Sequence, residues 1–401
     1  QHNLDVESAK SRLQEAQANS QYADADLGPS ISAMGVTGAL RSQTDRLFTT
    51  ERATSTANMR LGSVTASWEI DFFGKKQSDA DAAQSMVLSA REQIFAAQML
   101  VASQIAENYF NIFALQQQHS ILKQYENTLQ QLKHYIQGRF RAGQANANDI
   151  LEVEHRISTI QARQATLDNQ MATHQRSIAV LIGKTPQGFN IAKTVTNPLN
   201  RLPAEPKGTI PSDLLSRRPD LRSSQYYIQA QAAKLASAKA DLYPRFDIQF
   251  IGQTGRINLD TNIPDLKGWA GLVSAGINVP IFTNGRIQAN IDAADARLKN
   301  ALLQYDKALL QALADVDNSY QAQYALNNQM QLIQTADQQA KSQASNAEKL
   351  FRYGEKTLDN VLTAKLIALD YQEQLIQIKL NRAKNLVSLY KALGGGWSDK
   401  H

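Results

Sequence analysis

The segment Phe140–Gly143 (Phe-Arg-Ala-Gly) recurs 211 positions later as Phe351–Gly354 (Phe-Arg-Tyr-Gly). The same offset brings Asn148–Leu151 onto Asp359–Leu362, and similar Ala-Asp-Leu-x-Pro segments lie near the start of each copy. Matches in register over most of a chain indicate an internal duplication.

The duplication divides the chain into four parts. They are a first structural repeat at 1–183, a linker at 184–218, a second structural repeat at 219–396 and a C-terminal tail at 397–401. The linker contains five of the ten prolines, which favours an extended segment.

Each repeat is predicted to contain a helix, two strands, a long helix, a turn and another long helix. In the first repeat we expect strands at about 29–40 and 60–72, separated by the polar stretch Arg41–Asn58, and a hairpin tip at 138–148. In the second we expect strands at about 245–257 and 269–282 and a hairpin tip at 353–358.

Composition excludes several classes of protein. The 401 residues include no cysteine, which rules out disulfides, thiolate metal sites and a cysteine nucleophile. No apolar run approaches the ~18–20 residues of a membrane-spanning helix. The sequence begins at Gln1 without a signal-peptide pattern, so any secretion signal has been removed or is not part of it.

The long helices carry a coiled-coil-like seam. Leu298, Leu302, Tyr305, Leu309 and Leu313 recur with a spacing close to 3.5 residues. A helix of about 62 residues is about 93 Å long and needs partners along its length. The helices alone are equally compatible with a rigid coiled-coil scaffold.

The strands favour a membrane. Trp269, Gly271, Val273, Ala275 and Ile277 share one face, and such alternation over ~9–11 residues is long enough for a tilted strand to cross a bilayer. A half-buried soluble sheet would show the same pattern. In lipid, however, four strands with open edges must join other copies, giving 8 strands in a dimer or 12 in a trimer.

Four stretches carry a resemblance to a known family: Ser212–Leu221, Ala238–Pro244, Val279–Gly285 and Tyr390–Trp397. With the duplicated order, the chain resembles the TolC-like outer-membrane factors, the exit ducts of Gram-negative tripartite efflux pumps, and most of all their OprM branch. Members usually have a segment before the first helix, often with a lipid-bearing cysteine. Here the sequence begins at that helix, so either the segment is missing or this member has no anchor.

The resemblance implies an α+β membrane protein. We expect a homotrimer with a 12-stranded transmembrane β-barrel in the outer membrane, four strands coming from each chain. The barrel would continue into a long periplasmic α-helical barrel of coiled-coil-like helices. Its expected partners are outer-membrane lipid, a periplasmic adaptor protein and an inner-membrane pump.

The hairpin tips are the first candidate site. Gly143 and Gly354 suit the left-handed turn that ends a helix. Arginines near a helix C-terminus also compensate the helix dipole, which is an alternative to a docking role. We predict that the adaptor docks on Phe140, Arg141, Gly143, Phe351, Arg352 and Gly354.

The second candidate site is a channel constriction. Asp359 and Thr363 are spaced to share a helix face, and the resemblance places the periplasmic constriction in this stretch. Three copies of Asp359 would form a ring of carboxylates that attracts cations. We predict a constriction formed by Asp359, Asn360, Thr363 and, more weakly, Asp149, although an Asp in the first turn of a helix is also common.

The remaining motifs predict no chemistry. The six histidines lack zinc-site spacing, and the net charge of +5 is not gathered into a nucleic-acid-binding stripe. We therefore expect no enzyme activity, no metal, no cofactor and no nucleic-acid partner. The expected function is an exit duct for small toxic compounds in multidrug efflux. A type I protein secretion duct and a soluble coiled-coil scaffold are the alternatives.

Overall fold

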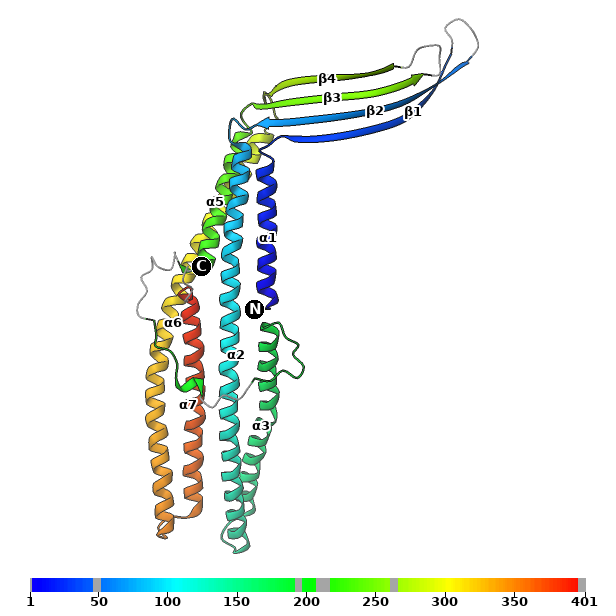
Figure 1. Ribbon diagram of the computed structural model, residues 1–401. Helices are drawn as coiled ribbons and strands as arrows, with labels where there is room; N and C mark the ends of the chain where they lie inside the picture. Colours follow the sequence, from blue (N-terminus) through cyan, green and yellow to red (C-terminus); the bar gives the residue numbers. More distant parts are fainter. Residues whose placement is uncertain (1, 46–51, 192–196, 207–216, 260–265, 396–401) are drawn as a thin grey trace. The chain divides into compact units, whose positions relative to one another are not determined.

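The computed structural model describes residues 2–45, 52–191, 197–206, 217–259 and 266–395 (Figure 1). Its elements are α1 (Leu4–Ala25), β1 (Ser30–Asp45), β2 (Arg52–Ile70), α2 (Lys75–Arg141), α3 (Ala147–Leu181), the 3₁₀ turn η1 (Pro198–Asn200), α5 (Pro219–Ala240), β3 (Arg245–Leu259), β4 (Leu266–Asn278), α6 (Arg286–Arg352) and α7 (Leu358–Ala392).

The same order of elements occurs twice. Helix α1 leads to β1, β2, α2 and α3 in the first half, and α5 leads to β3, β4, α6 and α7 in the second. The two long helices α2 and α6 each have 67 residues. No helix in the described part of the chain has an apolar stretch long enough to span a lipid bilayer.

Two compact units form, and neither is one half of the sequence. Unit 1 contains residues 1–11, 92–222 and 306–401, and unit 2 contains residues 12–91 and 223–305. Each unit therefore takes segments from both halves.

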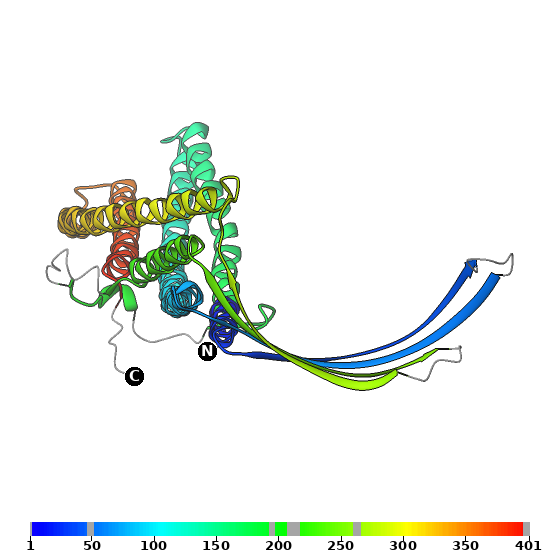
Figure 2. The ribbon, with the colours of Figure 1, turned by 90° about the horizontal axis from the view of Figure 1, so that it is seen from above.

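Unit 2 contains an antiparallel sheet in the order β1-β2-β3-β4, whose strands curve along their length (Figure 2). Two ladder pairs define its faces where the strands join the helices: Trp68 lies opposite Ile248, and Glu69 lies opposite Asp247. Neighbouring residues of a strand point to opposite faces. We call the face with Trp68 face A and the face with Glu69 face B.

The polarity of the two faces exchanges along the strands. Near the helices face A is apolar, whereas further along it carries Arg60 opposite Arg256. Face B changes the other way, from Glu69 to Leu61. Glycines of β1 and β2, Gly35 and Gly62, pair directly near the point of change.

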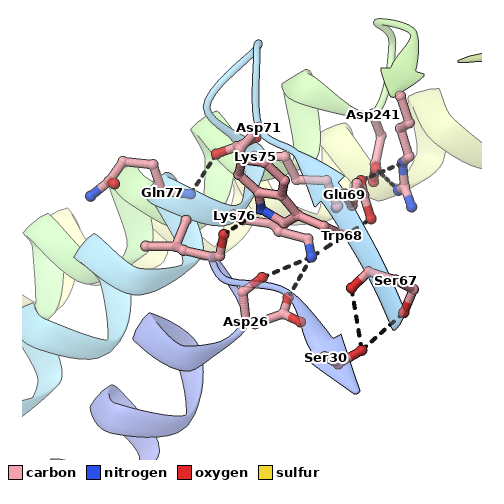
Figure 3. Close-up of polar contacts among 12 residues, drawn as sticks. Asp26, Ser30, Ser67, Trp68, Glu69, Asp71, Lys75, Lys76, Gln77 and Asp241 are labelled. Atoms are coloured by element: carbon pink, nitrogen blue, oxygen red, sulfur yellow. Dashed lines mark hydrogen bonds and ion pairs between the residues drawn. The ribbon is translucent and has the colours of Figure 1, made fainter. Parts of the chain in front are cut away.

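Polar contacts hold the strands to the helices at the end of the sheet where the two meet (Figure 3). The indole Nε1 of Trp68 donates to the carbonyl of Leu27 at 2.9 Å, and Lys76 donates to the carbonyl of Asp26 at 2.9 Å. Lys75 forms an ion pair with Asp241 at 2.9 Å. These bonds connect β2 and α2 to the ends of α1 and α5.

Unit 1 is built from helices with apolar seams. One cluster joins α2, α3 and α7; its fully buried or nearly buried members include Leu122, Leu129, Ile157 and Leu362. A second cluster joins α6 and α7 through small side chains, among them Ala347 and Ala364. In Figure 1 the α2–α3 and α6–α7 turns lie at the same end of this unit.

Several predicted boundaries are wrong. The stretch Arg41–Asn58 does not break the strand pair, because β1 continues to Asp45 and β2 begins at Arg52. Strand β4 ends at Asn278 rather than 282, since Pro280 has no N–H for the ladder. The first hairpin tip begins later than the predicted residue 138, because Gly138 is still part of α2, which ends at Arg141.

The linker at 184–218 is not wholly extended. Its described part contains η1, whose Leu199 is 3% exposed and packs against α2 and α7. Residues 192–196 and 207–216, with the first half of the resembling stretch 212–221, lie outside the described residues. So do residue 396 and the tail at 397–401.

Candidate functional site

The first hairpin tip is closed by a glycine turn. Gly143 has φ +73° and donates its N–H to the carbonyl of Phe140 at 3.0 Å. The N–H of Gln144 donates to the carbonyl of Arg139 at 2.8 Å. This pair of bonds is the Schellman motif, which satisfies carbonyls at the C-terminal end of a helix.

The second tip repeats this turn. Gly354 has φ +76° and donates to the carbonyl of Phe351 at 3.0 Å, and Glu355 donates to the carbonyl of Leu350 at 2.9 Å. The predicted left-handed conformation of Gly143 and Gly354 is confirmed. Both tips are therefore tight turns of the same geometry.

The side chains predicted to dock an adaptor surround these turns. Phe140 and Phe351 are 45% and 40% exposed, which is high for aromatic rings. Arg141 and Arg352 are exposed as well, and Arg352 donates to Glu348 at 3.0 Å. Each tip thus displays an aromatic ring and a guanidinium beside its glycine.

The helix after the first tip begins with a complete capping box. The side chain of Asn146 accepts from the N–H of Asp149 at 3.0 Å, and the carboxylate of Asp149 accepts from the N–H of Asn146 at 3.0 Å. Asp149 is therefore engaged in starting α3, which favours a structural role over a place in the constriction.

The helix after the second tip begins differently. Thr357 makes no side-chain bond to the backbone of α7; its hydroxyl donates to the amide oxygen of Asn360 at 2.8 Å. Oδ1 of Asp359 is buried and has no hydrogen-bond partner among the described residues. An unpaired buried carboxylate oxygen carries a desolvation cost, and this oxygen makes no cap of the kind that Asp149 makes at the start of α3.

Helix α7 buries two of its sides within unit 1. Leu362 and Leu366 pack with α2 and α3, and Val361 and Ala364 pack with α6. Thr363 lies between these contacts and is exposed, as is Asn360. Asp359 precedes Thr363 by four residues and so belongs to the same face of α7. Its Oδ1 is buried, however, so that of the three predicted constriction residues on α7 only Asn360 and Thr363 are exposed.

Sequence reasoning missed a further acid on this helix, Asp370. Burial raises the pKa of its carboxyl group, although the hydroxyl of Tyr125 donates to it. Burial and then the neighbouring Asp370 raise the pKa of Tyr125 to about 12. The spacing of Asp359, Thr363 and Asp370 along one helix face is the signal that would have found it.

Asp370 belongs to a polar contact between α7 and the first hairpin. Glu373, one turn further along α7, forms an ion pair with Arg163 of α3. It also accepts from the amide of Gln118 in α2 at 3.0 Å. In the described part of the chain, no three acidic or histidine side chains are placed to hold a metal ion.

Comparisons with known proteins identify the family. The family model described as "Outer membrane efflux protein" matches residues 1–184 and 210–395. The pyoverdine export outer membrane protein OpmQ of Pseudomonas aeruginosa is 27% identical over 398 residues, 98% of this chain and 82% of that protein. The cation efflux system protein CusC of Escherichia coli K12 is 26% identical over 401 residues, 98% and 84% of the two chains.

Solved structures confirm the fold. The outer-membrane channel OprN superposes with a TM-score of 0.82 at 22% identity, covering 98% of this chain and 88% of that one. The predicted fold class is thereby confirmed. The chain belongs to the outer membrane efflux protein family: it is an α+β channel, not an enzyme, of the Gram-negative outer membrane that extends into the periplasm, and three copies complete its 12-stranded barrel.

Proposed function

We propose that this channel is the exit duct of a tripartite multidrug efflux pump. It would receive small toxic compounds from an inner-membrane pump through a periplasmic adaptor and release them outside the cell. Relatives named for export of pyoverdine and of cations carry chemically unlike cargo. The shared architecture therefore does not select one cargo, which favours a duct open to many small compounds.

The observation that carries this proposal is the repetition of the tips. Two segments 211 residues apart form the same glycine turn with an exposed Phe and an exposed Arg. Aromatic and arginine side chains are the residues most often found at energetically important positions of interfaces. Three chains would present six such tips, a ring that suits an adaptor assembled from similar copies.

Cross-linking tests the docking. The chain has no cysteine, so Ala142→Cys and Glu355→Cys each introduce a unique thiol at a tip. With a thiol-reactive photo-cross-linker in cells, we expect an adduct that mass spectrometry identifies as a periplasmic adaptor. Ser158→Cys, exposed on α3 away from the turn, is the matched control. An adaptor adduct that forms equally well from Ser158→Cys would contradict docking at the tips.

We also propose that Asp359, Asn360 and Thr363 line the periplasmic constriction. The exposed positions of Asn360 and Thr363, at the same end of α7 as Asp359, support this assignment. Three chains would bring three carboxylates together, and repulsion between like charges would then widen the entrance or retain a cation. Asp149 is left out of this constriction, because its carboxylate caps α3.

The cargo is tested by deletion of the gene. Loss of an efflux duct sensitises the cell to several chemically unrelated toxic compounds and leaves protein secretion unchanged. Loss of one secreted protein without a change in drug sensitivity would instead support the type I secretion alternative. Family membership removes the soluble coiled-coil scaffold from consideration.

A further inference from the structure

The described sheet of unit 2 begins with β1 at one edge and ends with β4 at the other. A closed barrel of three copies has no unpaired edge, so β4 of one copy lies beside β1 of the next. Helix α6 follows β4 and α1 precedes β1, so these two helices are also brought together between copies. The chain contains a junction of the same kind inside itself, where β2 and α2 of the first half meet β3 and α5 of the second.

Two offsets relate the halves of the chain in unit 2. Pro29 and Pro244, which follow α1 and α5, are 215 residues apart. Gly74 and Gly285, which precede α2 and α6, are 211 residues apart, and both have positive φ, +71° and +78°. The first offset therefore relates α1 and β1 to α5 and β3, and the second relates β2 and α2 to β4 and α6.

The register of the strands provides an independent check of these offsets. In the first half, Ser30 lies opposite Ser67. The two offsets carry these residues onto Arg245 and Asn278, which lie opposite one another in the second half. The internal junction can therefore serve as a template for the junction between copies.

Ion pairs between α2 and the α5 segment hold the internal junction. Lys75 pairs with Asp241, just after α5, at 2.9 Å (Figure 3). Lys234 of α5 pairs with Asp79 of α2 at 2.7 Å. The side chains of Lys75 and Asp241 are only 25% and 18% exposed, and Ser237, four residues before Asp241, is 5% exposed. The junction thus covers the side chains at its centre.

The counterparts of the central ion pair are complementary in charge and exposed. The offsets place Arg286 at the start of α6 where α2 has Lys75, and Asp26 just after α1 where α5 is followed by Asp241. Arg286 is exposed. The side chain of Asp26 is 63% exposed, although Lys76 pairs with it at 3.3 Å. A single chain therefore leaves uncovered the two charges whose counterparts it covers inside itself.

The neighbouring positions show the same contrast. Tyr22 of α1 is the counterpart of Ser237 and is 82% exposed. Asn19 of α1 and Asn290 of α6 correspond to the second internal ion pair, and both are exposed. Amide side chains carry donors and acceptors, so these two can form hydrogen bonds with each other. Tyrosine is enriched at interfaces between proteins, which suits a ring that is uncovered in one copy.

Helix α6 packs on its own half through a different side. Ile287, Ile291 and Ala294 form an apolar cluster with α5. Arg286 and Asn290 are one turn apart and share a face beside this apolar stripe. That face is therefore left for another chain.

From these matched positions we propose that Arg286 of one copy forms an ion pair with Asp26 of the next copy, and that Tyr22 of that next copy packs beside it on α6. The junction between copies then repeats the junction inside one chain, and three such junctions close the ring. Each copy contributes Arg286 to one junction and Asp26 to the other. This inference concerns assembly and depends neither on the cargo nor on the adaptor.

Cross-linking of the detergent-solubilised trimer tests the position of the two residues. The chain has no cysteine, so the double variant Arg286→Cys, Asp26→Cys carries two thiols in each copy. A short bifunctional thiol reagent should join them between copies and give a covalent trimer on a denaturing gel. The double variant Lys75→Cys, Asp241→Cys is the internal reference, because the same reagent should join its thiols within one chain.

The negative control moves one thiol along α1. In Arg286→Cys, Glu15→Cys the second thiol lies about 16 Å further along the helix, so this variant should remain monomeric on the gel. Trimers are first verified by their mass in detergent. Covalent trimers that form equally from this control, or none from Arg286→Cys, Asp26→Cys while the internal reference reacts, would overturn the proposal.

A double-mutant cycle tests the ion pair itself. Arg286→Gln should lower the temperature at which the trimer dissociates by a few degrees, since an exposed pair contributes little but occurs three times. In an Asp26→Asn background the same change should have almost no effect, because the partner is already lost. Lys299→Gln removes a cation from another face of α6 and should leave the temperature unchanged. Equal shifts from Arg286→Gln in both backgrounds, or a Tyr22→Ala variant that dissociates as the parent does, would contradict the proposed contact.

Discussion

The two helical hairpins of unit 1 end in turns of the same geometry but differ in the side chains that hold their helices together. Helices α2 and α3 are joined by branched apolar side chains, among them Leu129 and Ile157, and the capping box of Asn146 starts α3. Helices α6 and α7 meet through alanines such as Ala347, and Thr357 makes no equivalent cap.

Polar contacts accompany apolar burial further along the second hairpin, where Leu386 and Leu389 of α7 pack with Leu313 of α6. Asn385 of α7 donates to Gln323 of α6, which is only 1% exposed, and Arg382 donates to Asn327. When two helices separate, hydrogen bonds between them are replaced by hydrogen bonds to water at a small net cost in free energy. Leucines that separate expose apolar area to water, which costs more. Duplicated hairpins can thus keep one turn geometry while the packing beside the turns differs, with branched side chains in the first and alanines in the second.

The largest difference should appear in core truncations. Leu129 is fully buried, so Leu129→Ala should lower the free energy of unfolding by about 2–5 kcal/mol. Ala347→Gly at the α6–α7 contact should cost about 1 kcal/mol. Denaturant unfolding of the detergent-solubilised protein, followed by circular dichroism, measures both. A loss for Ala347→Gly as large as that for Leu129→Ala would contradict this difference in packing.

Removal of the caps isolates the difference at the tips. Asn146→Ala should destabilise the start of α3 by about 1 kcal/mol, because it leaves the N–H of Asp149 without its acceptor. Thr357→Ala should change the start of α7 by much less. Hydrogen exchange of the first-turn amides reports each helix separately. A larger acceleration in α7 from Thr357→Ala than in α3 from Asn146→Ala would contradict the comparison.

The two tip acids should differ in conduction. Asp359→Asn should reduce the cation preference of the channel in planar bilayers by about two- to fivefold, since a unit charge 4 Å from an ion in water contributes about 1 kcal/mol. Asp149→Asn should leave selectivity unchanged, because this carboxylate caps α3. If both variants retain the parent reversal potential, Asp359 does not belong to the constriction.

Acidification should give the smallest effect. It should weaken the contact made by Glu348 and strengthen the contact made by Asp370. Hydrogen bonds from Lys365 and Arg352 lower the pKa of Glu348, which ties α6 to α7. Its ionised form is favoured on folding, so its contribution is present above the unfolded value of 4.5 and is lost as pH falls through the lowered pKa.

The contribution of Asp370 to stability changes with pH in the opposite direction. Burial raises its pKa, so the folded protein penalises the ionised form at neutral pH and is relieved as pH falls through the raised value. The groups around it are Tyr125 of α2, Glu373 of α7, and Arg156 and Arg163 of α3. As the pH falls from 7, the protection factors for exchange (intrinsic rate divided by observed rate, which removes the pH dependence of the chemistry itself) should rise where α7 meets the first hairpin. Below pH 4.5 the protection factors between α6 and α7 should fall. Glu348→Gln should abolish only the second change.

Much of the architecture could be predicted because repeated residues have local effects. Gly143 and Gly354 specify their turns whatever surrounds them. Likewise Pro219 is the first residue of α5, a position that proline favours because its missing N–H would be unpaired there in any case. The extended β1 and β2 could not be predicted, since the apolar positions change from odd residues such as Leu61 to even residues such as Val64. A period-two pattern that changes phase looks like the end of a strand.

The candidate site shows the same limit. By sequence, Asp149 and Asp359 are both acids in the first turn of a helix after a tip, and the prediction places both in the constriction, Asp149 only more weakly. Only coordinates show that one is bonded to Asn146 and the other has an unpaired oxygen. The contact of Asp370 with Tyr125 joins residues 245 positions apart, a distance no local pattern bridges.

Each compact unit takes segments from both halves of the chain, and this constrains how the protein is made. Unit 1 needs residues 306–401 as well as 1–11. During export through the inner membrane the N-terminal half emerges first and has no complete unit to join, so its apolar seams stay open to misassociation until the last segments arrive. Maturation must therefore follow translocation, and a periplasmic chaperone that holds the first half would raise the yield of assembled channel.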